Sequence, residues 1–146
     1  MSAPGSPVSK HTIRRRVFFY ECDGAGIVHF SNYFRYMEEA EHGLWRATGL
    51  SIARDELGVS FPRVAASFEY HSPLRFEDEV DIQVRIVSIS NRSMKYTCTM
   101  TRNGQPVATG SATIVCVAYQ PDKSIKAVPI PPEIASRFAV AAGAAS

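Results

Sequence analysis

One stretch of this chain has the periodicity of a long α-helix, and almost everything after it alternates as β-strands do. Apolar residues recur at helical spacing from Tyr33 through Met37 and Leu44, and Gly49 is a natural stop, so we expect a helix over Tyr33–Thr48. Residues 80–86 instead alternate apolar and polar with period two, which is typical of a half-buried strand. The order predicts an α+β fold in which a curved antiparallel sheet wraps one long central helix.

The predicted sheet has about five strands. The first covers Ile13–Tyr20 and ends in the β-favouring run Val17–Tyr20. Asn103-Gly104 is a strong signal for a two-residue hairpin turn. The helix covers one face of the sheet, so the other face and the edge of the last strand remain open, which favours association. The four strands expected after the helix are Val64–His71, Val80–Ile86, Met94–Met100 and Val107–Tyr119.

The length and the composition indicate one globular domain. A chain of 146 residues with 45% hydrophobic residues suffices for a single core. We expect the domain to cover residues 11–138, with a disordered tail at 1–10 and a frayed, Ala-rich tail at 139–146. We interpret the run Arg14–Arg16 as a strand start with solvated side chains.

Charge and cysteine content exclude several classes of protein. The net charge is only +2 and the basic residues are dispersed, so a nucleic-acid partner is not expected. The three cysteines, Cys22, Cys98 and Cys116, have no zinc-ligand spacing and their odd number argues against a disulfide framework. This favours a reducing, cytoplasmic location. No apolar run is long enough for a secretory signal or a membrane helix.

The segment from Glu21 to Tyr33 has the features of a catalytic loop. Asp23 precedes a flexible Gly-Ala-Gly turn, and Ser31 or Asn32 can cap the helix that follows. A carboxylate held near the positive end of a helix stays ionised, and free N–H groups there suit a reaction that forms an oxyanion. Alternatively, Asp23 is an ordinary turn residue whose side chain bonds the local backbone.

The same segment closely resembles the signature of the 4-hydroxybenzoyl-CoA thioesterase family, whose members have the hot-dog fold. The resemblance extends over roughly residues 12–120, and it implies hydrolysis of an acyl-CoA with Asp23 as general base or as nucleophile. Gly24 stands where the namesake enzyme has Pro, so the identity of the acyl group stays open. The residues that fit the family pattern are Asp23, Gly26, Ile27, Val28, Asn32 and Tyr33.

The resemblance also implies roles for other residues of the site. The backbone N–H of Phe30 aligns with the oxyanion donor, and Gly26 supplies a backbone conformation or a close approach. His29 lies beside this position and is a further catalytic candidate, although lone histidines are more often structural. Glu38 aligns with a position that contacts the acyl group, and Val64 belongs to the strand expected to line the pocket.

Coenzyme A is expected to be part of the substrate, so no separate cofactor and no metal are predicted. The pair Glu39 and His42 has a di-iron spacing but no second pair, and we interpret the charges at 38–42 as helix surface. The turn Ser90-Asn91-Arg92-Ser93 with Lys95 is the candidate site for the coenzyme A phosphates.

Three alternatives remain open from the sequence. A Cys22–His29 or Cys22–His71 nucleophile is conceivable, although the resemblance points to the carboxylate. The chain could be a non-catalytic acyl-CoA binding or partner-assembly module. It could also hydrolyse thioesters on an acyl-carrier protein. In the enzyme, we expect a homodimer or homotetramer with each site built across two subunits.

Overall fold

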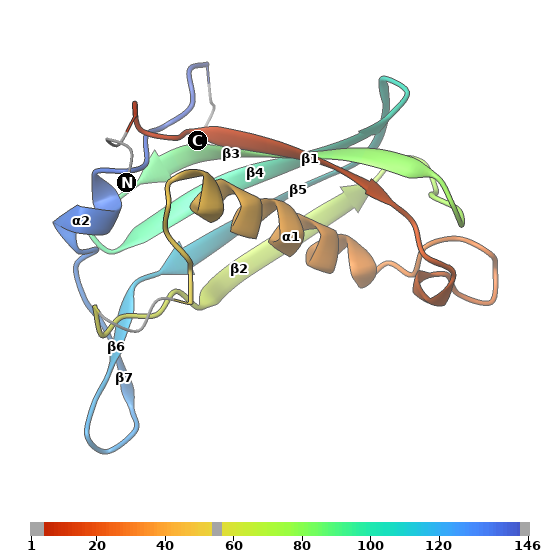
Figure 1. The fold of residues 1–146 in the computed structure, drawn as a ribbon. Helices are drawn as coiled ribbons and strands as arrows, with labels where there is room; N and C mark the ends of the chain where they lie inside the picture. Colours follow the sequence, from red (N-terminus) through yellow and green to blue (C-terminus); the bar gives the residue numbers. More distant parts are fainter. Residues whose placement is uncertain (1–4, 54–56, 144–146) are drawn as a thin grey trace.

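The computed structural model describes residues 5–53 and 57–143, in which one five-stranded antiparallel sheet curves around one long helix (Figure 1). This is the α+β arrangement that the sequence predicted. The elements in chain order are β1 Lys10–Arg16, the 3-10 turn η1 Phe19–Glu21, α1 Asn32–Ala47, β2 Arg63–Tyr70, β3 Glu79–Ile89, β4 Ser93–Arg102, β5 Gln105–Val115, β6 Val117–Tyr119, β7 Ile125–Ala127 and α2 Pro132–Ala135.

The strand order in the sheet is β1-β3-β4-β5-β2, so β1 and β2 form its edges. The prediction that the last long strand leaves an open edge was therefore wrong. Strand β5 pairs with β4 on one side and with β2 on the other. The hairpin between β4 and β5 was predicted correctly: Asn103 and Gly104 have φ of 52° and 77°, the left-handed values that this turn requires.

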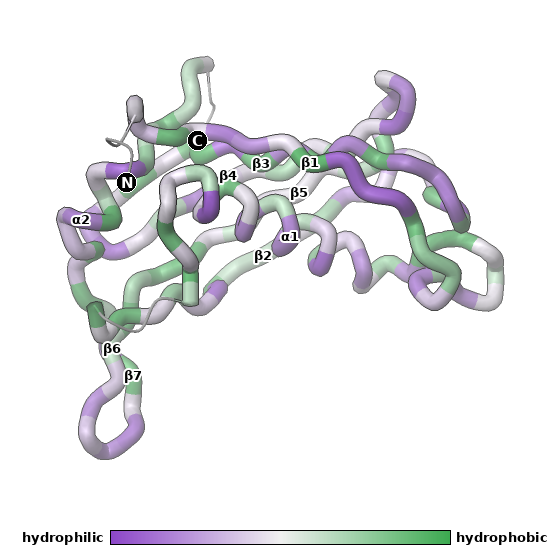
Figure 2. Tube along the Cα trace, viewed as in Figure 1, coloured by the Kyte–Doolittle hydropathy of each residue, from purple (hydrophilic) through white to green (hydrophobic). Residues whose placement is uncertain are grey.

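The core lies between α1 and the central strands. Ile82 and Val84 of β3 and Met100 of β4 have no solvent exposure, and Trp45 on the last turn of α1 is 1% exposed. Figure 2 shows hydrophilic residues recurring along one side of α1. Strand β2 differs from the central strands, because all of its residues except Phe68 are exposed. The helix packs on the core residues of β3 and β4 and also contacts β2, where the rings of Tyr33 and Phe34 lie against Phe68.

The charges on α1 do not all lie on its surface, which corrects the sequence interpretation. Glu41 has no solvent exposure and is paired with Arg63 at the start of β2. Burial raises the pKa of the Glu41 carboxyl, although the nearby Tyr96 and Arg63 act in the opposite direction. Helical spacing alone could not reveal this pair, because its cation comes from a distant strand.

Two strand boundaries also differ from the prediction. The run Val17–Tyr20 is not extended: the chain leaves the sheet after Arg16 and forms η1, which turns Glu21 inward. The strand expected over Val107–Tyr119 is broken at Cys116, where β6 turns away and pairs with β7. The β6–β7 hairpin and α2 gave no clear signal in the sequence.

Backbone hydrogen bonds extend into both segments that the sequence analysis assigned to tails. Val8 donates its N–H to Arg137 and accepts one from Ala139, and Lys10 already belongs to β1. Ala141 donates to Ile86 on β3. The hydrogen-bonded part thus extends beyond the predicted limits of 11 and 138. Residues 1–4 and 144–146 of the two predicted tails lie outside the described residues.

Gly110 on β5 leaves no room for a side chain. A Cβ there would lie 2.6 Å from the Ser67 carbonyl oxygen and 2.7 Å from the Phe68 ring. We expect Gly110→Val to lower the free energy of unfolding by about 1–3 kcal/mol through overpacking. Urea unfolding checks this, with Thr99→Val on the exposed side of β4 as the control. Equal midpoints for both variants would contradict the packing argument.

Candidate active site

The loop between η1 and α1 is closed on itself by backbone hydrogen bonds. Asp23 donates its N–H to Ile27 over 2.8 Å, Gly26 donates to Asp23 over 3.0 Å, and Cys22 and Val28 form a β-bridge. Gly26 has φ of 80°, and no atom lies within 4 Å of a Cβ built there. Of the two roles considered for Gly26, the structure thus supports a special backbone conformation rather than a close approach.

The Asp23 side chain is exposed at the rim of this loop. One carboxylate oxygen accepts the N–H of Ala25 over 2.8 Å, the local turn contact that the alternative interpretation anticipated. This bond occupies one oxygen, and the second has no hydrogen-bond partner among residues 5–53 and 57–143. Local structure and a chemical role are therefore compatible at this residue.

Asp23 and Phe30 line the same pocket, which has a volume of about 460 Å³. The lining is mostly apolar, with a few polar groups at its edge. The far wall comes from the end of β2, where the Tyr70 hydroxyl donates to the Phe30 carbonyl oxygen over 3.0 Å. Burial raises the pKa of Tyr70, so this hydroxyl stays protonated as a donor. The lining residues are Asp23, Ile27, Val28, Phe30, Tyr33, Tyr70, His71, Ser72 and Pro73.

The Phe30 backbone has a free donor just before the helix. Within the described part of the chain its N–H makes no hydrogen bond, whereas the neighbouring N–H groups of His29 and Asn32 donate to Glu21 and His29. An unpaired N–H at a helix entry favours negative charge. A carbonyl oxygen that becomes negative beside this N–H would be stabilised, and Asp23 lines the same pocket.

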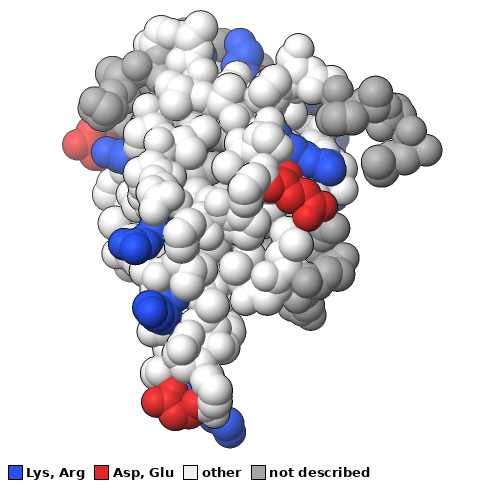
Figure 3. Space-filling model, turned by 90° about the vertical axis from the view of Figure 1, so that its left-hand side faces the viewer, with Lys and Arg blue, Asp and Glu red and all other residues white. Residues whose placement is uncertain are grey.

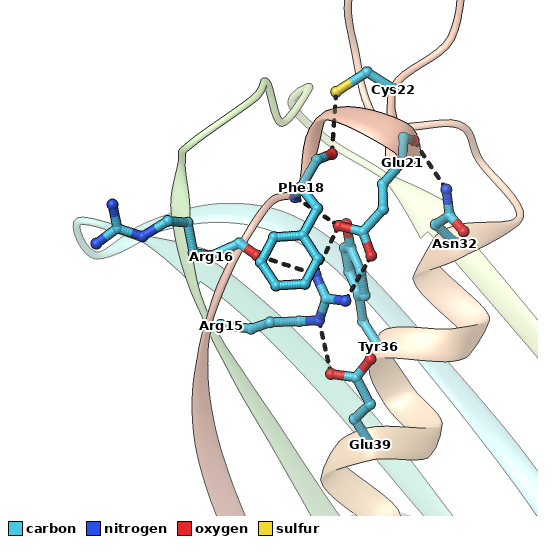
Figure 4. A network of polar contacts seen from close by, with 8 residues as sticks. All are labelled: Arg15, Arg16, Phe18, Glu21, Cys22, Asn32, Tyr36 and Glu39. Atoms are coloured by element: carbon cyan, nitrogen blue, oxygen red, sulfur yellow. Dashed lines mark hydrogen bonds and ion pairs between the residues drawn. The ribbon is translucent and has the colours of Figure 1, made fainter.

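A buried charge network holds the start of this loop, and it corrects one prediction (Figure 4). Arg15 is not solvated: its side chain is 13% exposed and forms two bonds of 2.5–2.7 Å with the Glu21 carboxylate. Arg15 also binds Glu39 on α1 over 2.7 Å. Glu21 accepts further bonds from the Phe18 N–H at 2.8 Å and the Tyr36 hydroxyl at 2.9 Å. The network joins β1, η1 and α1.

The surroundings of Glu21 keep it ionised. Burial alone would raise the pKa of this carboxyl, but the hydrogen bonds from Arg15, Phe18 and Tyr36 outweigh it and lower the pKa below its ordinary value. Burial and the bond to Glu21 both raise the pKa of Tyr36, which therefore remains a donor. The network consists of one cation, two carboxylates and a neutral hydroxyl.

His29 lies beside the pocket, and the start of the helix is not capped as predicted. Ser31 is the N-cap residue, but its side chain makes no cap bond and instead lies 2.8 Å from Nδ1 of His29. The Asn32 amide donates to the Glu21 carbonyl over 2.9 Å, so it ties the helix to the loop rather than capping it. The His29 ring stacks on Phe30 and does not line the pocket.

The predicted acyl-contact residues lie away from Asp23 in this chain. Glu38 forms an ion pair of 3.1 Å with Arg63 beside a smaller pocket of about 160 Å³, which Phe34 and Met37 also line. Val64 is 62% exposed near the start of β2. Asp23 lies instead beside the opposite end of that strand, so one chain does not bring these two sets together.

The predicted coenzyme A turn also lies at the far end of the sheet. Across the sheet, Ile89 pairs with Met94, Met94 with Ile114, and Ile114 with Arg63. The 90–93 turn therefore lies near the start of β2. Ser90 and Ser93 bond each other over 2.6 Å, while Arg92 is exposed and Lys95 half-buried. On the face that Figure 3 shows, Lys and Arg side chains are scattered rather than clustered.

Several other groups bear on the chemistry. Cys22, Cys98 and Cys116 are free, and burial raises the pKa of the Cys98 thiol to about 12. No cluster of three or more metal-ligating side chains occurs in the described residues, and no described helix has the length and apolar character needed to cross a membrane.

The sequence analysis did not identify Tyr70 or the roles of Glu21 and Arg15. Alternation in β1 could have flagged Arg15, because it shares a side with Ile13.

Comparisons with known proteins agree with this geometry. The sequence model of the thioesterase-like superfamily matches residues 17–138. An acyl-CoA thioester hydrolase of Escherichia coli is 27% identical to this chain, and the alignment covers 84% of this chain and 91% of the relative. The crystal structure of a hypothetical protein from Aquifex aeolicus is 31% identical, with a TM-score of 0.80 over 88% of this chain and 98% of that one.

The fold is the hot-dog fold that the resemblance implied. The structure of 4-hydroxybenzoyl CoA thioesterase from Pseudomonas sp. strain CBS-3 matches with a TM-score of 0.78 at 23% identity. The match covers 87% of this chain and 97% of that one. At this identity the likeness shows the shared fold.

The backbone at Gly26 yields a test with a matched control. A β-branched residue is strained at a φ of 80°, so Gly26→Val is expected to deform the loop and lower kcat/KM by roughly 10-fold to 100-fold. Gly24 is equally uncrowded but does not have a positive φ, so Gly24→Val is expected to retain most activity. Equal losses in steady-state assays of the two variants would show that conformation is not the reason for glycine at 26.

Proposed function

The chain belongs to the thioesterase-like superfamily and is a thioester hydrolase, and we propose that it hydrolyses an acyl-CoA to the free acid and coenzyme A in the pocket of Asp23 and Phe30. The oxygen of a water molecule adds to the carbonyl carbon, the C–S bond breaks, and the coenzyme A sulfur takes up a proton. Asp23 accepts the proton of the attacking water as a general base, or it attacks the carbonyl itself and forms an anhydride that water then opens.

One observation carries this proposal: Asp23, with an exposed carboxylate, and Phe30, with an unpaired backbone N–H, line the same pocket. The first supplies the base or nucleophile, and the second meets the negative charge that develops on the carbonyl oxygen. An oxyanion donor of this kind contributes about 3–4 kcal/mol in other acyl-transfer enzymes.

The open edge at β2 supports a proposed homodimer, alone or within a homotetramer. Seven of the eight residues of β2 are exposed, including Val64 at 62% and Tyr70 at 45%. An open edge strand of this length is a template for pairing with a second copy. Antiparallel pairing of two β2 strands across a two-fold axis would place the Arg63 end of one subunit beside the Tyr70 end of its partner.

This dimer would bring the predicted substrate-contact residues of one chain close to the Asp23 pocket of its partner. Glu38, Val64 and the turn of Ser90, Asn91, Arg92 and Ser93 with Lys95 all lie toward the Arg63 end of the sheet. The same pairing brings that end next to the partner's pocket. We therefore propose that these residues contact the acyl group and the coenzyme A phosphates of a substrate whose carbonyl lies at the partner's Asp23.

Two other functions are set against this one. A non-catalytic acyl-CoA binding module has no use for a carboxylate and a free N–H on one wall. A thioesterase acting on acyl-carrier protein shares the chemistry, so comparing acyl-CoA with acyl-carrier-protein substrates decides between the carriers.

Unpaired cysteines suit a reducing compartment, and we propose that the protein is located in the cytoplasm.

Asp23→Asn is the direct test of the chemistry. The amide keeps the shape and the bond to Ala25 but removes the base or nucleophile, so we expect kcat to fall by about 10²–10⁴-fold or more with unchanged folding. Thiol release from short, long and aryl acyl-CoAs measures this. Asp122→Asn is the control, because Asp122 makes a similar turn contact to the Ser124 N–H on the distant β6–β7 hairpin. Wild-type kcat in Asp23→Asn would refute the assignment.

Complementation between two variants tests the shared site. The double variant Arg92→Ala, Lys95→Ala is expected to raise KM with little change in kcat, and Asp23→Asn is expected to retain little of the wild-type kcat. A co-expressed hetero-oligomer purified through two different tags is expected to have a near-wild-type KM and about half the kcat, because one of every two sites combines intact parts. A KM that stays raised, or light scattering that shows an active monomer, would contradict the proposed dimer.

A further inference from the structure

Glu21 connects the two halves of the candidate site through its backbone. Its carbonyl oxygen accepts the His29 N–H over 2.9 Å and the Asn32 side-chain amide over 2.9 Å. Glu21 lies two residues before Asp23, and His29 lies one residue before Phe30. This peptide group, together with the loop's own backbone bonds, therefore helps to fix how far the chain segment bearing the carboxylate lies from the segment bearing the free N–H.

The Glu21 side chain fixes that peptide group in turn. The side chain is 6% exposed and accepts four bonds of 2.5–2.9 Å from Arg15, the Phe18 N–H and the Tyr36 hydroxyl. The donors come from β1, from the residue before η1 and from α1. Because they approach from three directions, the carboxylate has little freedom to move relative to the sheet or the helix.

We propose that Glu21 is a positioning residue for the hydrolysis, which holds Asp23 at the working distance from the Phe30 N–H without touching the substrate. The proposal rests on the proposed function of Asp23 and Phe30. It assigns to Glu21 an effect on kcat and little effect on substrate binding. Misplacement of a reacting group by about 1 Å lowers rates by roughly 100-fold in other enzymes.

The negative charge of Glu21 keeps Arg15 in place beside the loop, because Arg15 can otherwise bind Glu39 alone. Arg15 lies between Glu21 and Glu39, and its guanidinium packs 4.4 Å from the ring centre of Tyr36. In Glu21→Gln, one carboxylate oxygen becomes an NH₂ group that cannot accept the 2.5 Å bond from Arg15, while Arg15 keeps its bond to Glu39. Unpaired buried donors are unfavourable, so the loop is expected to shift.

The structure offers a matched pair of variants for the test. Glu21→Gln and Glu39→Gln each remove one carboxylate from the same arginine, but Glu39 is 45% exposed and, in the described part of the chain, forms no hydrogen bond with the Asp23 loop. We expect Glu21→Gln to lower kcat by about 10-fold or more with KM within about twofold of wild type, while Glu39→Gln changes neither. Both are compared below the melting temperature of the less stable variant.

A double-variant cycle separates positioning from a loss of stability. In the Asp23→Asn background, Glu21→Gln is expected to cause a much smaller further loss of kcat, because the group it positions is already gone. A purely structural role would lower the melting temperature and leave the kcat of the folded enzyme intact. Equal losses of kcat in both backgrounds would also overturn the proposal.

If Glu21→Gln does not fold, Tyr36→Phe keeps the test open. It removes one of the four bonds to the carboxylate and retains the ring against Arg15, so we expect a loss of kcat of about threefold with unchanged KM. Unchanged kcat in Tyr36→Phe overturns the proposal. Wild-type kcat in Asp23→Asn would instead refute the proposed function, so the two failures are distinguishable.

Discussion

The buried pair between Arg15 and Glu21 is the interaction on which the site depends most. It joins the first strand, the 3-10 turn and the helix at a point only two residues before Asp23. A buried ion pair adds little stability when its partners are not fully hydrogen-bonded, but removing one partner is strongly unfavourable. Here every oxygen of the Glu21 carboxylate has a donor. The pair therefore serves to specify one geometry of the Asp23 loop.

Local sequence patterns were sufficient for the elements whose side chains contact near neighbours. Helical spacing located α1 to within one residue, and period-two alternation located β3 and β4. Asn103-Gly104 located the hairpin turn between β4 and β5. The motif around Asp23 and Gly26 located the loop because its turn residues lie within a few positions of one another. The boundaries failed where a long-range contact decides: Val17–Tyr20 has strand propensity, but Glu21 must turn inward to meet Arg15 and Tyr36.

The candidate site was predictable only in part for the same reason. Asp23 and the Phe30 N–H are seven residues apart, and a short loop brings them to one pocket. Tyr70 reaches that pocket from β2, which no local pattern indicates. Glu38, Val64 and the 90–93 turn lie toward the opposite end of the sheet, so the role proposed for them depends on a second subunit. The exposure of β2 is compatible with the proposed dimer, in which that subunit would complete the site.

The central claim is that a thioester carbonyl reacts between Asp23 and the Phe30 N–H. The most direct measurement is a crystal structure of the Asp23→Asn variant with a bound acyl-CoA that it turns over slowly. The account predicts the carbonyl oxygen within hydrogen-bond distance of the Phe30 N–H, the carbonyl carbon facing the residue at 23, and the nucleotide on the partner subunit near Arg92. A carbonyl group bound outside this pocket, or one that contacts neither residue, would contradict it.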